Sequence, residues 1–288
     1  MKKKILIVLT IFFITIFTTG CFKKDKMEDI NILTTVYPIN YIIDNLYGSY
    51  SNITSIYPKG SNPSSYKLTN KQLKDYSSSD LLIYNGISDE KNYAKELLNL
   101  NSDLKIIDAS YGIDYINSEK EIWLNPSNML MMAQNIKREL KSYISNPYII
   151  EDLEKNYEQF KVNMSELDSK FKNVAQNSNN VKIITSDETF NFIQKYGFDV
   201  INLTKNGEII SKNVTTAQSL LKDKKLTYVF VMENEETNTT IEKLISDNKA
   251  KKIVLKTLSN ITDNDSNNNE DYLSIMNDNI DNIALETY

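Results

Sequence analysis

The feature that most constrains the fold is a long amphipathic stretch near the middle of the chain, residues 146–177. Its apolar residues recur at alternating steps of three and four, which places them on one stripe of an α-helix. These residues are Ile150, Leu153, Tyr157, Phe160, Met164, Leu167, Phe171 and Val174. At ~1.5 Å per residue the part of this helix from Ile150 to Val174 extends for roughly 36 Å, about the width of a domain. We therefore expect a rigid helix that joins two lobes; the alternative is a short coiled coil.

Strand-like and helix-like segments alternate on both sides of this helix. The strand-like segments are 30–36, 52–57, 81–84, 105–108, 181–185, 200–203, 228–232 and 252–255. This alternation predicts an α/β fold with two lobes, built on mainly parallel sheets and joined by the long helix. We place the N-terminal α/β lobe at 30–145, the linking helix at 146–177 and the C-terminal α/β lobe at 178–288. Because ligands bind beyond the carboxyl ends of parallel strands, a ligand cleft is expected between the lobes.

The first residues form a separate unit. Lys2, Lys3 and Lys4 precede a short apolar run that ends before Gly20 and Cys21, which predicts a signal peptide at 1–20. Thr18-Thr19-Gly20-Cys21 resembles a bacterial lipobox, in which the cysteine is lipid-modified. We therefore expect an exported lipoprotein, anchored to the outer face of the cytoplasmic membrane through Cys21, with 21–29 as a tether. The alternative is an ordinary secreted protein with one free thiol.

Several classes of function are disfavoured by composition. The chain contains no histidine, which excludes Ser-His and Cys-His nucleophiles, and no phosphate-binding glycine motif is present. A net charge of −5 without a basic stripe argues against nucleic-acid binding. We expect a monomer that is not an enzyme. Within the polar tract 259–269, residues 263–267 begin like a calcium-binding loop, but Asn268 replaces the turn glycine and Ser274 the final glutamate. The tract is therefore interpreted as a solvated linker.

Several short motifs follow one another from residue 30 to the C-terminus. They are Thr34-Thr35-Val36-Tyr37-Pro38, Tyr57-Pro58-Lys59-Gly60 with 62–66, Tyr84-Asn85-Gly86, 108–110, 122–126, Thr185-Ser186-Asp187, 230–234 and 271–276. In this order they resemble the metal receptors of bacterial ABC importers, the zinc and manganese solute-binding lipoproteins also called adhesin-type receptors. The resemblance implies that the chain captures a solute between its lobes and delivers it to an ABC permease and its ATPase.

The resemblance also implies a set of ligands. That family holds its ion with three histidines and a carboxylate near the C-terminus. Carried over motif by motif, these positions fall on Ser64, Glu121, Asp187 and either Glu270 or Asp271. Every imidazole is therefore replaced. Cleft-shaping roles are expected for Tyr66, Trp123 and Glu233.

The chemistry of these side chains changes the expected ion. Carboxylate and hydroxyl oxygens suit Mn²⁺, Ca²⁺ or Mg²⁺ better than Zn²⁺, which favours imidazole and thiolate. Three carboxylates in one cleft also repel each other unless a cation is present. The prediction is a divalent metal ion held by oxygen ligands. Two alternatives remain open: a cationic or polar organic solute, and a fold that has lost metal binding and serves surface adhesion or interaction.

Overall fold

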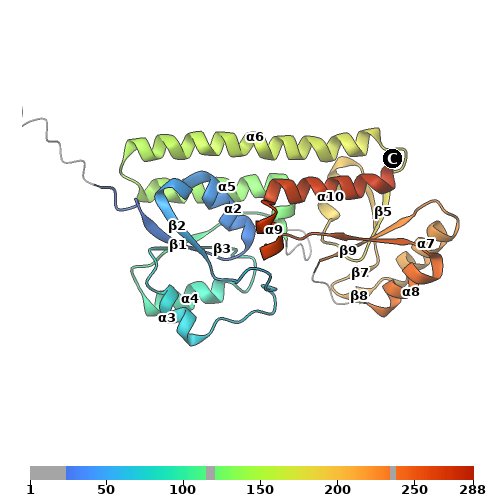
Figure 1. The fold of residues 1–288 in the computed structure, drawn as a ribbon, viewed down its shortest axis with the longest axis horizontal. Helices are drawn as coiled ribbons and strands as arrows, with labels where there is room; N and C mark the ends of the chain where they lie inside the picture. The colour runs from blue at the N-terminus through green and yellow to red at the C-terminus, as the bar shows by residue number, and fades with distance from the viewer. Residues whose placement is uncertain (1–23, 115–120, 234–237) are drawn as a thin grey trace, which may run out of the picture.

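The computed structural model describes residues 24–114, 121–233 and 238–288. Two α/β lobes lie side by side, and helix α6 (Pro147–Asn177) runs along both of them (Figure 1). The predicted fold class, two α/β lobes with parallel sheets, is confirmed. The signal peptide 1–20 and the lipidation site Cys21 lie outside the described residues. None of the helices in the described part of the chain is long and apolar enough to cross a membrane.

The N-terminal lobe is a four-stranded parallel sheet with helices around it. Its strands are β1 (Ile30–Thr34), β2 (Ser51–Ser55), β3 (Leu81–Tyr84) and β4 (Lys105–Asp108), in the order β2-β1-β3-β4. Its helices are α2 (Tyr37–Tyr47), η1 (Gly48–Tyr50), α3 (Asn70–Tyr76), α4 (Lys91–Leu100), η2 (Ile122–Leu124) and α5 (Pro126–Tyr143). The central strands are apolar on both faces, as a parallel sheet covered on both sides requires.

The C-terminal lobe repeats this arrangement. Its sheet contains β5 (Lys182–Thr185), β6 (Asp199–Asn202), β9 (Tyr228–Met232) and β10 (Lys251–Leu255), in the order β10-β9-β5-β6. A small hairpin, β7 (Thr204–Lys205) and β8 (Glu208–Ile209), accompanies η3 (Asn191–Tyr196), α7 (Ser211–Lys222), α8 (Thr239–Asn248), α9 (Asp263–Asn267) and α10 (Tyr272–Thr287). Numbered within each lobe, the strand order is second, first, third, fourth in both. A crevice for ligands is therefore expected between the first and third strands of each sheet.

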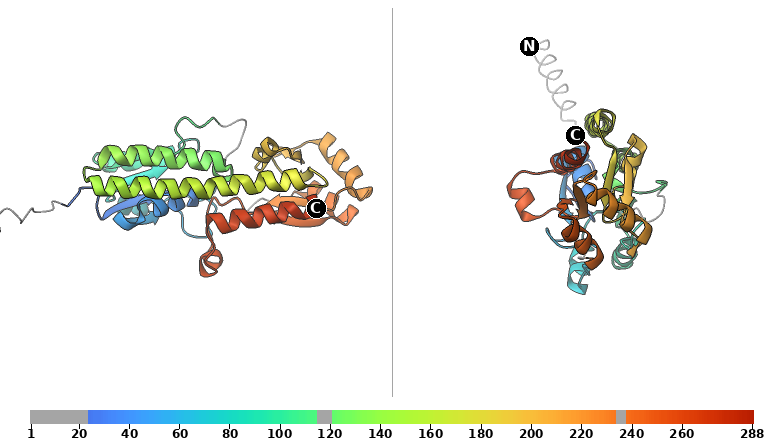
Figure 2. Two further views of the ribbon diagram at one scale, coloured as in Figure 1. Left: turned by 90° about the horizontal axis from the view of Figure 1, so that it is seen from above. Right: turned by 90° about the vertical axis from the view of Figure 1, so that its right-hand side faces the viewer.

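Helix α6 holds the two lobes through its apolar stripe. It lies beside α5 and α2 along one half and beside α10 along the other (Figure 2). Phe160 contacts Tyr41 of the N-terminal lobe, with ring centroids 6.1 Å apart, and Phe171 stacks on Tyr196 of the C-terminal lobe at 5.3 Å. Each fully buried side chain of this size contributes about 1.5–3 kcal/mol.

The stripe departs from the predicted one only at its ends. Ile149 and Ala175 are buried there, whereas Ile150 and Val174 are only partly buried. A spacing that averages 3.5 residues drifts around a straight helix of 3.6 residues per turn, by about 20° per heptad. The buried face therefore rotates slightly over the length of α6.

The residues before β1 differ from the predicted tether. Asp25 is buried, and its carboxylate accepts hydrogen bonds from the backbone N–H groups of Ser145 and Asn146 at 2.8 and 2.6 Å. Met27 is also buried, and its carbonyl accepts a hydrogen bond from the Tyr47 hydroxyl. Because Asp25 satisfies N–H groups where α6 begins, the folded lobe starts at Asp25 and not at residue 30.

Candidate functional site

The lobes meet where loops that follow the strands contact each other. Trp123 of η2 donates a hydrogen bond through Nε1 to the carbonyl of Thr257 at 2.8 Å. The hydroxyl of Tyr272 in turn donates to the carbonyl of Trp123 at 2.7 Å. The Trp123 side chain is 3% exposed, so it lies within the contact between the lobes and does not line an open cleft.

Residues 256–271, which we call the junction segment, carry the C-terminal lobe's side of this contact. The Asn260 amide donates to the carbonyls of Pro58 and Ser61 at 2.7 and 2.8 Å. The backbone N–H of Gly60 donates to the carbonyl of Ile261 at 2.9 Å. The prediction of a solvated linker over 259–269 is therefore wrong: the tract includes helix α9 and binds the loop at 58–61.

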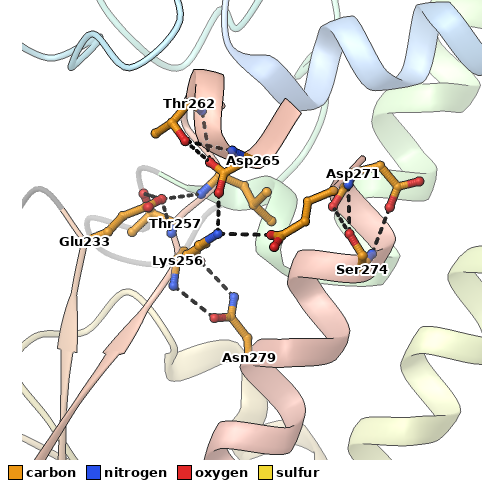
Figure 3. A network of polar contacts seen from close by, with 10 residues as sticks. Glu233, Lys256, Thr257, Thr262, Asp265, Asp271, Ser274 and Asn279 are labelled. Carbon is orange, nitrogen blue, oxygen red and sulfur yellow. Dashed lines mark hydrogen bonds and ion pairs between the residues drawn. The ribbon is translucent and has the colours of Figure 1, made fainter. Parts of the chain in front are cut away.

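Glu233, predicted to shape the cleft, supports the start of this segment. Its Oε1 accepts hydrogen bonds from the backbone N–H groups of Thr257 and Leu258, at 2.7 and 3.0 Å (Figure 3). Leu258 has a φ of 61°, a left-handed conformation that is unfavourable for a leucine. The Glu233 carboxylate thus stabilises a strained backbone turn from within the same lobe.

Lys256 lies between two carboxylates of the junction segment. Its Nζ is 2.6 Å from Asp265 Oδ1 and 3.1 Å from Glu270 Oε2 (Figure 3). Burial alone would lower the pKa of Lys256, but hydrogen bonds to Asp265 and Glu270 outweigh it and raise the pKa. Asn279 accepts from the Lys256 backbone N–H and donates to its carbonyl, at 2.9 and 2.8 Å. The ammonium group is therefore held charged at a fixed place, and Glu270 is its partner.

Asp271 has a structural role next to Glu270. Its Oδ1 accepts the backbone N–H of Ser274, and the Ser274 hydroxyl accepts the backbone N–H of Asp271, both at 2.8 Å. This reciprocal pair is a capping box at the start of α10, an arrangement worth about 1 kcal/mol. Of the two candidates for the fourth ligand, Asp271 is engaged in the cap and Glu270 in an ion pair.

A cavity of about 500 Å³ opens between α2 and the junction segment. It is lined by Tyr37, Asn40, Tyr41, Asp44, Asn45, Ser55, Tyr57, Lys59, Asn260, Ile261, Ser266, Glu270 and Asp271. Burial, and then the charge of Asp271, raise the pKa of both Tyr37 and Tyr41, so their hydroxyls stay neutral. The volume falls in the range of small-molecule sites. Neither Ser64, Glu121 nor Asp187 lines this cavity.

The other predicted residues lie outside this cavity. Ser64 is exposed after β2, and its backbone N–H donates to Asn62 Oδ1 at 2.9 Å. Tyr66 accepts a hydrogen bond from Gln72 at its hydroxyl. Glu121 is half-buried immediately before η2, and Asp187 is half-buried after β5, where its carboxylate accepts the N–H of Thr189 at 2.9 Å.

These positions do not form a ready metal site in this conformation. Over residues 24–114, 121–233 and 238–288, no group of three or more His, Cys, Asp or Glu side chains is close enough to hold a metal ion. The predicted acids Glu121, Asp187 and Glu270 are therefore not gathered around one point. One physical reason is visible at Glu270, whose carboxylate is directed to Lys256.

Three residues with marked roles were not singled out from the sequence. Asn260 acts through partners about two hundred residues away and Lys256 through partners 9 and 14 residues away, and no local motif marks either residue. Glu90, 5% exposed near the end of β3, accepts the backbone N–H of Asn85 at 3.1 Å. Burial raises the pKa of Glu90 to about 7. A single acid before a helix gives no sequence signal of such burial.

Comparisons with known proteins relate the chain to a family of known proteins. Residues 32–285 match the family described as zinc-uptake complex component A, periplasmic. The zinc-binding protein AdcA of Streptococcus pyogenes is 20% identical over 325 residues, which cover 100% of this chain and 62% of AdcA. The manganese ABC transporter substrate-binding lipoprotein PsaA of Streptococcus pneumoniae is 25% identical over 308 residues and 98% of each chain.

The fold agrees with this assignment. The crystal structure of the metal-dependent lipoprotein YcdH from Bacillus subtilis superposes with a TM-score of 0.76 at 19% identity, over 90% of this chain and 99% of that one. The match to the family model covers most of the sequence. The chain therefore belongs to the zinc-uptake complex component A family.

Proposed function

We propose that this chain is the extracytoplasmic receptor of an ABC importer, and that it captures a divalent metal ion between its lobes. In this role it acts as a monomer, transfers the ion to a membrane permease coupled to an ATPase, and is held at the outer face of the cytoplasmic membrane by a lipid on Cys21. It performs no catalysis. The observation that carries the proposal is the family match over residues 32–285.

The proposed ligands are oxygen atoms. Glu121, Asp187 and Glu270 supply carboxylates, and Ser64 supplies a hydroxyl. Asp271 is the secondary candidate because it already caps α10. With no histidine in the chain, the site favours Mn²⁺, Ca²⁺ or Mg²⁺ over Zn²⁺. A divalent ion also relieves the mutual repulsion of three carboxylates, which gives a physical reason for their side chains to converge on it.

Binding requires local rearrangement and little movement of whole lobes. Hydrogen bonds from Trp123 to Thr257 and from Asn260 to Pro58 already join the lobes at two points of the junction segment. Helix α6 also packs against both lobes, so wide hinge closure would break its buried contacts. Side-chain exchange at Glu270 and small shifts of the loops that carry Ser64 and Asp187 are the changes that this scaffold permits most easily.

Thermal unfolding of the full chain, purified in detergent and stripped with chelator, tests the proposal. An ion at 100 times its dissociation constant adds roughly 2.7 kcal/mol, a shift of several degrees. We expect Mn²⁺ or Ca²⁺ to raise Tm in the wild type but not in Glu121→Gln/Asp187→Asn. The control Asp278→Asn, on the exposed side of α10, keeps the shift. If no ion changes Tm, the proposal fails.

The cavity favours a second candidate, a small organic cation. Its three tyrosine rings and the carboxylates of Asp44 and Asp271 suit an ammonium group through cation–π and charge interactions. The same assay with 1,4-diaminobutane tests this alternative. Stabilisation that is lost in Asp44→Asn but kept in Glu121→Gln/Asp187→Asn would favour the organic solute over the metal ion.

A further inference from the structure

We infer that Lys256 is a built-in competitor for the metal ion: its ammonium group occupies Glu270, and the incoming ion must displace it. The inference rests on the proposed function, because it assigns Glu270 as a metal ligand. It assigns to Lys256 a role in setting affinity, although Lys256 itself never contacts the ion.

The placement of Lys256 is the first support. Both of its backbone polar groups are paired with Asn279, a side chain that is 1% exposed on α10. Its side chain extends from the end of β10 toward the two carboxylates of Asp265 and Glu270 (Figure 3). A lysine on a mobile loop would change partners freely. The backbone of Lys256 is fixed by Asn279, and this directs its side chain toward Glu270, just before α10.

The two carboxylates are not equivalent. Asp265 is buried, with a side chain 8% exposed, and it also accepts hydrogen bonds from the N–H and hydroxyl of Thr262, at 3.0 and 2.6 Å. The Glu270 side chain is 26% exposed, lies farther from the ammonium group and lines the cavity. Asp265 is therefore the fixed anchor of Lys256, and Glu270 is the partner that can be exchanged.

Electrostatics makes the exchange competitive. An ammonium group and a divalent ion that share one carboxylate are only a few ångströms apart and repel each other strongly. When the ion binds Glu270, Lys256 retains Asp265, so only one of its two ion pairs is lost. Lys256 thus lowers the affinity of the receptor for the ion. The lower affinity favours release of the ion to a permease.

Removal of the ammonium group should tighten binding. A partly exposed ion pair is worth up to about a fivefold change in an equilibrium constant. We expect Lys256→Met to lower the Kd for Mn²⁺ by about fivefold or more, since the repulsion disappears as well. Lys256→Met/Asp265→Asn, which also removes the carboxylate left buried, should show the same gain if the single variant folds poorly.

The measurement is a calorimetric titration of Mn²⁺ into the full chain in detergent, with circular dichroism as the folding check. Lys252→Met is the matched control, since Lys252 lies on β10, the strand that ends just before Lys256, and pairs with Glu242 instead of Glu270. It should leave the Kd unchanged. Adding Glu270→Gln to Lys256→Met should abolish the gain.

The outcomes separate the two ideas. Tighter binding in both Lys256 variants than in the wild type, lost again with Glu270→Gln, supports the inference. Equal Kd values in the wild type and in both variants overturn the inference and leave the proposed metal receptor intact. If no protein in the series binds Mn²⁺, Ca²⁺ or Mg²⁺, both the inference and the proposed function fail.

Discussion

The two lobes share one strand order but use their carboxylates differently. In each lobe an acid that follows the third strand turns back to accept backbone N–H groups: Glu90 after β3 and Glu233 after β9. Glu90 is 5% exposed and holds the loop of its own strand at Asn85. Glu233 is half-buried and accepts hydrogen bonds from Thr257 and Leu258, at the start of the junction segment.

This difference shows that the acid after the third strand has a different structural role in each lobe. In the N-terminal lobe the acid stays within its own lobe, where burial raises the pKa of Glu90 to about 7. In the C-terminal lobe the acid holds the start of the junction segment, whose Asn260 contacts the other lobe. An acid at a strand end is therefore not a ligand by position alone; its hydrogen-bond partners decide its role.

The largest effects should come from the stripe of α6 that serves both lobes. Phe160→Ala and Phe171→Ala each leave a cavity at a fully buried site and should cost about 3–5 kcal/mol in urea unfolding. Val162→Ala, on the same helix at 46% exposure, should cost about 0.5 kcal/mol or less. Hydrogen exchange should rise first in the N-terminal lobe for Phe160→Ala and in the C-terminal lobe for Phe171→Ala. An identical exchange pattern would contradict independent lobe packing.

Glu90→Gln should change how the stability of the protein depends on pH. A carboxyl group with a pKa of about 7 in the folded chain and 4.5 in the unfolded chain binds more protons when folded, so stability falls as pH rises between these values. This shift corresponds to about 3 kcal/mol. The stability of Glu90→Gln relative to wild type should therefore rise by about 3 kcal/mol from pH 4.5 to 8. The exposed control Glu96→Gln should show the same dependence of stability on pH as the wild type. If Glu90→Gln also showed the wild-type dependence, the raised pKa of Glu90 would be refuted.

Glu233→Ala should weaken the C-terminal counterpart of this contact. It leaves the N–H groups of Thr257 and Leu258 without their acceptor, at a cost of about 2 kcal/mol. Amide exchange at these two residues should accelerate more than at β5. Unchanged exchange at Leu258 would show that its left-handed backbone is held by packing and not by Glu233.

Asn260→Ala should have the smallest effect, about 1 kcal/mol, because the carbonyls of Pro58 and Ser61 lose a donor but can reach water. Amide exchange should increase locally at 58–61 in the N-terminal lobe. Asn264→Ala, exposed on α9, is the matched control and should be neutral. Faster exchange across the entire C-terminal lobe would instead mean that Asn260 supports that lobe's core.

The sequence predicted those features that depend on local periodicity. The stripe of α6 and the alternation of strands and helices follow from residues a few positions apart, and burial in the structure follows the same pattern. The polar composition of the tract at 259–269 suggests solvent, but the Asn260 amide is satisfied by Pro58, 202 residues away, and the Asp265 carboxylate by Lys256, 9 residues away. The pairing of Glu270 with Lys256, 14 residues apart, has no helical or strand spacing that would mark it in the sequence.

The family's motifs indicated the loops in which the candidate ligands lie, but not the contacts that those loops make. Trp123 and Glu233 were expected at the cleft, and they instead make hydrogen bonds to the junction segment. The positions of Ser64, Glu121 and Asp187 as metal ligands remain predictions. They depend on how loops from two lobes approach an ion, which is a matter of tertiary geometry that residue spacing does not encode.

The most direct test of the proposed metal receptor is electron paramagnetic resonance of Mn²⁺ added to the chelator-stripped full chain. Free Mn²⁺ gives a sharp six-line signal that is lost on binding, and pulsed spectra report any nitrogen ligand. We predict loss of the signal up to one equivalent, with no nitrogen coupling, and a weaker loss in Glu121→Gln/Asp187→Asn. A six-line signal that persists undiminished in the presence of excess protein would contradict the account and direct attention to the tyrosine-lined cavity.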